Sequence, residues 1–542
     1  MKLKNHTLIS LLLFLMLFVC IGSVSAFEIQ TENISENNVI SISESPEILT
    51  ASASDDAVGV LSDENVISSD NRDWYVNASV ADGGNGSKFT PYKNFKSVLD
   101  NTNLQDGDTI YFAGKEKYTG NGINVNLDIS KKLNLLKYGS GEAVFDAEHN
   151  SGIFTVRASC INITGLTFIN GNANNGGAIY FSNAISNSNI NATYTNNTAG
   201  YGGANFFLNS VSDSNITGTY INNIASYGGA NNLRVVSNSN IGGTYIYNTA
   251  TRGNGGANNF QNRVSDSNIT GIYINNTATN DNGGANYFMN SVSDSNISGT
   301  YNHNVAGYNG GANYFLNSVS DSNIAGTYIY NTATKGNGGA NFFCVSVLNS
   351  NITGTYNQNI AHDGGANFFI EVSNSNITGT YNQNIAHDGG ANFFIEVSNS
   401  NITGTYNHNI AHDGGANFFI EVSNSNIAGI YNYNTAKNNG GANRFDSVSN
   451  SNISGTYNYN TALLYGGANY FGVSVSNSNI GGTYINNTAN YSGANYFRIS
   501  VSNSNITGAY INNTVTNGNG GANYFVGPVL NSRIGNKITI RG

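Results

Sequence analysis

The sequence predicts an all-β protein, a right-handed parallel β-helix with an N-terminal cap. A Gly-Gly-Ala element (once Ser-Gly-Ala) recurs every 25 to 28 residues over the last two thirds of the 542-residue chain. Each copy carries short groups of Val, Ile, Phe and Tyr between Gly, Asn and Ser, which is typical of short strands joined by tight turns. No copy places apolar residues at i, i+3, i+4 and i+7, so the repeat is not helical. The fourteen alanines of the element are Ala178, Ala204, Ala230, Ala257, Ala285, Ala312, Ala340, Ala366, Ala391, Ala416, Ala442, Ala468, Ala494 and Ala522.

The fixed and variable spacings within a copy separate strands from turns. From Val211 onward a valine is followed after five residues by an isoleucine, and after four more by a tyrosine. Length varies between the alanine and the valine, and between the tyrosine and the next alanine. Turns tolerate such variation, whereas stacked strands do not. A coil of this size with short strands, stacked on its neighbours at ~4.8 Å, is one turn of a parallel β-helix.

Two further features fit a stack of coils. Glycine permits the positive φ that a sharp corner needs, and the small alanine fits an inward corner. The asparagine after the alanine, for example Asn205 and Asn231, is expected to form an amide ladder from coil to coil. Right-handedness is expected from the general preference of parallel crossovers.

The order of segments along the chain follows from composition. Residues 1–26 have a basic start, an apolar run and small residues before Ala26, which predicts a cleaved secretory signal peptide. Residues 27–73 hold eleven carboxylates and one basic residue, which predicts a disordered acidic linker. Residues 74–150 are expected to form the N-terminal cap and the first coils, with a helix over 91–99 capped by Thr90. Residues 151–542 are the β-helix of fourteen repeats.

The charge of the repeat region limits its partners. Residues 151–542 contain eleven Lys or Arg and twelve Asp or Glu. A near-neutral, charge-poor surface has no basic stripe for a phosphate backbone, so we expect no nucleic-acid partner. Asn, Ser, Thr, Gly and Tyr offer hydrogen-bonding groups suited to glycans or protein loops. The apolar run near the N-terminus is shorter than a membrane span, so no transmembrane segment is expected in the mature chain. The oligomeric state is not predicted.

Many parallel β-helices degrade polysaccharides, so the positions of the acidic residues indicate whether catalysis is expected. That chemistry needs two or three clustered carboxylates. Here the acids occupy single repeat positions, such as Asp213, Asp266 and Asp294, which become asparagine in later copies. We therefore expect no catalytic residues, no cofactor and no enzymatic activity.

Three nearly identical copies provide the candidate metal ligands, His362, Asp363, His387, Asp388, His412 and Asp413. Their stacking should place imidazoles and carboxylates in columns at ~4.8 Å, beside a second column of Glu371, Glu396 and Glu421. Such columns either ligate a divalent ion or are solvated turn residues that duplication copied. We assign no metal site from the sequence. Carboxylates stacked without metal should show raised pKa values.

The repeats resemble known families. Phe168-Ile-Asn-Gly with Gly176-Gly-Ala-Ile179 is similar to the Gly-Gly-Ala repeats of chlamydial polymorphic outer-membrane proteins. Residues 74–542 as a whole resemble the β-helical, pectin-lyase-like adhesin-like proteins of methanogenic archaea. The resemblance implies a secreted or cell-surface adhesin, extracellular, that binds glycans or surface proteins of other cells or wall material. A polysaccharide-active enzyme, a carbohydrate-binding module and a passive surface-coat protein remain as alternatives.

Overall fold

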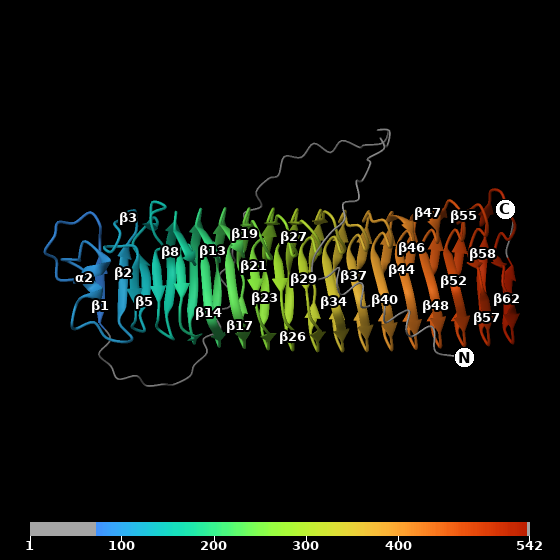
Figure 1. Ribbon diagram of the computed structural model, residues 1–542, viewed down its shortest axis with the longest axis horizontal. Helices are drawn as coiled ribbons and strands as arrows, with labels where there is room; N and C mark the ends of the chain where they lie inside the picture. The colour runs from blue at the N-terminus through green and yellow to red at the C-terminus, as the bar shows by residue number, and fades with distance from the viewer. Residues whose placement is uncertain (1–71, 539–542) are drawn as a thin grey trace. The chain divides into compact units, whose positions relative to one another are not determined.

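The computed structural model describes residues 72–538, so the predicted signal peptide and residues 27–71 of the predicted acidic linker lie outside the described residues. The described part is an all-β parallel β-solenoid of about 16 turns. Figure 1 shows its coils stacked in chain order, from β1 (Asp73–Val76) to β62 (Arg533–Ile538). The predicted fold class is therefore confirmed.

Successive copies lie directly on one another. Val372 pairs in parallel with Val397, and the ring of Tyr381 lies 4.8 Å from that of Tyr406 with 4° between their planes. This register follows from the repeat, because equal spacing places identical side chains on the same face of the sheet. The strands of these two coils are β37 (Asn367–Ser373), β38 (Asn376–Ile377), β39 (Thr380–Asn382), β40 (Asn392–Ser398), β41 (Asn401–Ile402) and β42 (Thr405–Asn407).

A third, shorter ladder closes each coil before the Gly-Gly-Ala corner. This ladder consists of two sheets, and isolated bridges at Ile360 and Ile385 connect the two. Its first sheet contains β9 (Asn172–Asn175), β13 (Thr198–Tyr201), β16 (Ile224–Tyr227), β20 (Thr249–Ala250), β24 (Thr277–Ala278), β28 (Val305–Ala306) and β33 (Thr332–Ala333). Its second contains β43 (Ile410–Asp413), β47 (Thr435–Asn439), β51 (Thr461–Ala462), β55 (Thr488–Ala489) and β59 (Thr514–Val515).

The interior of the coils is a set of identical columns. Valine, isoleucine, phenylalanine, tyrosine and alanine columns form one continuous buried cluster from Trp74 to Ile506. Inside it runs the predicted amide ladder, in which Asn367 Nδ2 donates to Asn392 Oδ1 at 2.9 Å and Asn392 Nδ2 donates to Asn417 Oδ1 at 3.0 Å. The side-chain amides of this ladder are buried and hydrogen-bonded to one another.

The corner glycines are required by geometry. Gly389 has a φ of +63°, and a Cβ built on it would lie 2.3 Å from the backbone oxygen of Asn392. An L-residue is disfavoured at this φ, and no side chain fits the space.

The first coils differ from the repeats. Helix α2 (Phe95–Leu99) buries Phe95 and Val98 against the core, with the Phe95 ring 5.0 Å from that of Phe112. The helix begins later than predicted, and its N-cap is Asn94 rather than Thr90, because Asn94 Oδ1 accepts the Ser97 amide. The end-cap role of residues 74–150 and the right-handed sense of the coils stay predictions.

The remaining strands of this region and of its first coils are β2 (Thr109–Ala113), β3 (Glu116–Tyr118), β4 (Leu127–Ile129), β5 (Asn134–Tyr138), β6 (Ala143–Asp146), β7 (Phe154–Val156) and β8 (Asn162–Ile169).

Candidate functional site

A column of aromatic side chains runs along the solenoid outside its main core. From Phe206 onward its members follow the laddered asparagine by one residue, and Tyr180 follows Ile179 at the equivalent position. They are buried or half-buried, with Phe368, for example, 4% exposed and outside the core cluster. Successive rings stack, as in the 5.0 Å between the centroids of Phe368 and Phe393. We call this the outer column. Its members are Tyr180, Phe206, Asn232, Asn259, Tyr287, Tyr314, Phe342, Phe368, Phe393, Phe418, Arg444, Tyr470, Tyr496 and Tyr524.

The outer column is interrupted in two neighbouring coils, where asparagines replace the rings. Asn232, in β17 (Asn231–Ser237), is fully buried, and neither atom of its amide group has a hydrogen-bond partner. Asn259, in β21 (Asn258–Phe260), is 4% exposed, and its Oδ1 is also unpaired. A buried amide without partners costs free energy, so these two positions are not explained by packing.

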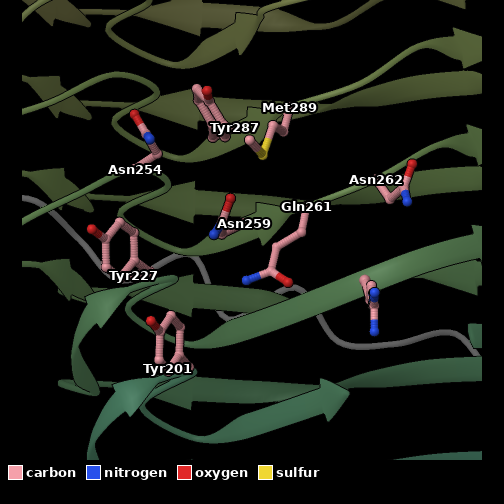
Figure 2. Close-up of a pocket in the computed structure, with 9 residues that line it drawn as sticks. Tyr201, Tyr227, Asn254, Asn259, Gln261, Asn262, Tyr287 and Met289 are labelled. Carbon is pink, nitrogen blue, oxygen red and sulfur yellow. The ribbon is translucent and has the colours of Figure 1, made fainter. Parts of the chain in front are cut away.

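A surface pocket of about 430 Å³ lies at this interruption. Figure 2 shows Tyr201 and Tyr227 one above the other on one side, Tyr287 and Met289 on the coil above, and Asn259 with Gln261 between them. The pocket is lined by Tyr201, Tyr227, Arg234, Asn254, Asn259, Gln261, Asn262, Tyr287 and Met289. Neighbouring coils therefore supply its walls, β13 and β16 from one side and β17, β21 and β25 (Asn286–Phe288) from the other.

The pocket combines aromatic surfaces with amides. Tyr201 and Tyr227 are 38% and 36% exposed, with ring centroids 5.4 Å apart. The four amide residues of the lining offer both donors and acceptors, and Arg234 adds one positive charge. These residues were not predicted from the sequence, because the repeat period alone does not show that the outer column lies outside the core. The replacement of Phe or Tyr by asparagine at Asn232 and Asn259 was the signal that could have found them.

The predicted His–Asp columns do form. Asp363, Asp388 and Asp413 are bridged in parallel from coil to coil, and the rings of His362 and His387 stack at 5.1 Å. In each of the first two copies the histidine Nδ1 lies near its neighbouring carboxylate, at 3.1 Å in His362–Asp363 and 3.3 Å in the next. Burial and then the charge of Asp363 raise the pKa of Asp388 to about 6, and interaction with Asp363 raises the pKa of His362.

The third copy differs from the first two. Asp413 accepts hydrogen bonds from Arg444 Nη1 at 2.8 Å and from Asn439 Nδ2 at 2.8 Å. Arg444 replaces an aromatic ring of the outer column, packs over the ring of Phe418, and also contacts Asp446. This pairing was not predicted from the sequence, because Arg444 lies 31 residues from Asp413. Burial and repulsion from His387 and Lys437 lower the pKa of His412.

The glutamate column is also in register, with Glu371 opposite Glu396 and Glu396 opposite Glu421. Burial and the charges of its two neighbours raise the pKa of Glu396. Burial is the larger cause of the raised pKa of both Glu396 and Asp388, and the expected repulsion between stacked carboxylates adds to it.

Comparisons with known proteins give no family. No protein-family model matches the chain, and no curated protein matches it. Within residues 72–538, no helix is both long enough and apolar enough to cross a bilayer, which agrees with the prediction for that part of the chain.

Two solved structures are similar to the chain at low identity. One is the native GH136 lacto-N-biosidase from Eubacterium ramulus, with 10% identity and a TM-score of 0.21. The other is its selenomethionine derivative, with 9% identity and a TM-score of 0.19. The match covers 71% of this chain and 64% of the other, which is less than two thirds of that protein's length.

The expectation that the chain has no enzymatic activity is contradicted by this comparison, since both solved chains are those of a glycosidase. That expectation was based on the lack of clustered acidic residues within one repeat. Carboxylates from different coils can still lie together in the folded chain. A likeness at this TM-score transfers neither mechanism nor residues, so enzymatic activity becomes a property to be measured.

Proposed function

We propose that the protein is a secreted or cell-surface carbohydrate-binding solenoid, an adhesin-like protein that holds glycans of cells or wall material in the pocket around Asn259. The observation that carries the proposal is the interruption of the outer column, where Asn259, a buried asparagine with an unpaired amide oxygen, replaces an aromatic ring in the lining of a pocket that also contains tyrosines. A ligand toward which this side chain turns recovers the free energy that the unpaired oxygen costs in the free protein.

The chemistry of the lining matches a sugar better than a phosphate or a lipid. A pyranose has apolar C–H faces and hydroxyl groups at its edge, which suit aromatic rings and amides respectively. The single formal charge, that of Arg234, is exposed at the pocket wall. A volume of about 430 Å³ has the size of a small-ligand site.

Export and surface display are part of the proposal. They are supported by the sequence of residues 1–26 and by the resemblance of the repeats to surface adhesins. Residues 151–542 carry almost no net charge, and exposed asparagines such as Asn376 and Asn401 recur from coil to coil. Both features support contact with neutral glycans.

A glycan array with the full-length chain tests the proposal, followed by titration of the best-retained glycan. Tyr227→Ala should weaken binding roughly tenfold or more, because it removes a ring from the pocket wall. Tyr433→Ala is the matched control, since Tyr433 is 48% exposed and lies outside the pocket. Equal losses in both variants, or no retained glycan, would contradict the proposal.

The same glycans should be assayed for new reducing ends. Release that disappears in Tyr227→Ala would assign hydrolysis to the pocket in addition to binding. Release that persists in this variant, without retention of any glycan, would place the carbohydrate chemistry elsewhere and contradict the assignment of the pocket.

A further inference from the structure

The three His–Asp copies differ in the group that pairs with the aspartate. Asp413 is neutralised by Arg444, whose guanidinium is 2.8 Å away. Asp363 and Asp388 have the same local sequence as Asp413 and lie in the same column, two coils and one coil earlier respectively. Among residues 72–538, neither of them forms an ion pair with a lysine or an arginine; their ion-pair partners are the adjacent histidines.

The carboxylate oxygens that face the histidines are buried and underused. Asp363 Oδ1 and Asp388 Oδ1 are both buried and accept no hydrogen bond, although each lies within ion-pair distance of an imidazole. The side chains are 19% and 20% exposed. Two adjacent anions in such surroundings repel each other and lack the donors that buried carboxylates normally have.

The imidazoles complete a set of ligands that is open to solvent. One ligand atom from each of His362, Asp363 and His387 lies within 4.8 Å of the others. The two histidine side chains are 57% and 48% exposed, so an ion has access and the rings have room to turn. In a tetrahedral site with bonds of about 2.0–2.2 Å the ligand atoms are about 3.3–3.6 Å apart, so the exposed histidine rings have to move inward by about 1 Å.

We propose that His362, Asp363 and His387 bind one divalent ion of the Zn²⁺ class, that Asp388, whose Oδ1 lies 3.3 Å from His387 Nδ1, moves in as the fourth ligand, and that Arg444 takes the place of this ion against Asp413. Two imidazole nitrogens and two carboxylate oxygens form a ligand set of borderline softness, which favours Zn²⁺ over Ca²⁺, an ion that takes six or more oxygens. The site is separate from the pocket around Asn259 and does not depend on glycan binding.

Calorimetric titration of Zn²⁺ into the full-length chain, produced without a histidine tag and freed of metal with a chelator, tests this inference. One equivalent should bind, and His387→Ala and Asp363→Asn should each weaken binding roughly tenfold or more. His408→Ala is the matched control, because His408 lies outside the cluster and stacks on Tyr433. Millimolar Ca²⁺ should not displace the ion.

A second measurement protects the test from misfolded variants. Co²⁺ added to the wild-type chain should give the strong visible absorption of a tetrahedral site, and Zn²⁺ should abolish it. Absence of saturable Zn²⁺ binding by the wild-type chain would overturn the inference. So would equal affinity in wild type and His387→Ala, or an octahedral Co²⁺ spectrum.

Discussion

The side-chain amide of Asn231 donates a hydrogen bond of 3.0 Å to the amide oxygen of Asn258, one coil further along the chain. Asn231 also accepts a hydrogen bond of 3.1 Å from Asn205. Because every internal member of this ladder both donates and accepts, the ladder joins each coil to both neighbours. The next residue, Asn232, is equally buried and has none of these partners. Two adjacent asparagines therefore have opposite roles.

Asn231→Leu should destabilise the protein. The change leaves the Asn205 donor and the Asn258 acceptor buried without partners, at about 1–3 kcal/mol for each group. Urea denaturation should show a lower midpoint than wild type. Asn401→Leu is the control, since Asn401 is exposed and its loss should change the free energy of unfolding by about 0.5 kcal/mol or less.

Asn232→Leu should stabilise the ligand-free protein, by about 1–3 kcal/mol, because it replaces an unpaired buried amide with an apolar group of similar size. The same denaturation series measures it. A destabilised Asn232→Leu variant would show that this amide is paired in solution.

Gly389→Ala should cost more than Gly122→Ala, although both glycines have a positive φ, of +63° and +70°. A Cβ at Gly389 meets the Asn392 backbone oxygen at 2.3 Å, whereas a Cβ at Gly122 meets nothing within 4 Å. We expect about 1–2 kcal/mol at Gly122 from conformation alone. At Gly389 we expect about 1–3 kcal/mol more from overpacking. Equal melting temperatures for the two variants would show that the corner relaxes.

The ion pair between Lys117 and Asp146 should make stability depend on acid pH. Burial alone would raise the pKa of Asp146, but hydrogen bonds from Lys117 at 2.6 Å, the Glu148 amide and Asn170 lower it overall. A lowered folded-state pKa contributes stability above the unfolded-state value, which is lost as the pH falls through the folded-state value. Asp146→Asn should therefore be less stable than wild type at neutral pH.

Denaturation of both proteins in steps from pH 7 down to about pH 2 checks this, since the two stabilities should converge once the wild-type carboxyl is protonated. A constant difference over the whole range would contradict the assignment, because the variant keeps the geometry and loses the charge.

The repeat allowed most of the fold to be predicted. Valine, isoleucine and tyrosine columns are set by fixed spacing, and so Val372 over Val397 and Tyr381 over Tyr406 follow from the sequence. The helix start was misplaced, because Thr90 before Pro91 has good capping chemistry, whereas in the structure it is Asn94 whose side chain accepts the Ser97 amide. Thr90 instead bonds to Ser87 and Asn85.

The candidate sites were predicted less completely. Duplication of three copies revealed the His–Asp column, but the sequence could not show that Arg444 neutralises Asp413 and leaves Asp363 and Asp388 without such a cation. The pocket was not predicted, because Asn259 is one of many asparagines in the chain. Asn259 is distinguished from the other asparagines only by its place in the outer column, where most other coils have an aromatic ring.

Titration of the array-selected glycan against wild type and Asn259→Tyr tests the central claim most directly. Tyrosine at position 259 restores the outer column and fills the pocket, while it keeps a residue type found at Tyr287 in the next coil. The proposal predicts saturable binding by wild type and loss of binding by a variant that is as stable as wild type or more so. Undiminished binding by Asn259→Tyr would contradict it.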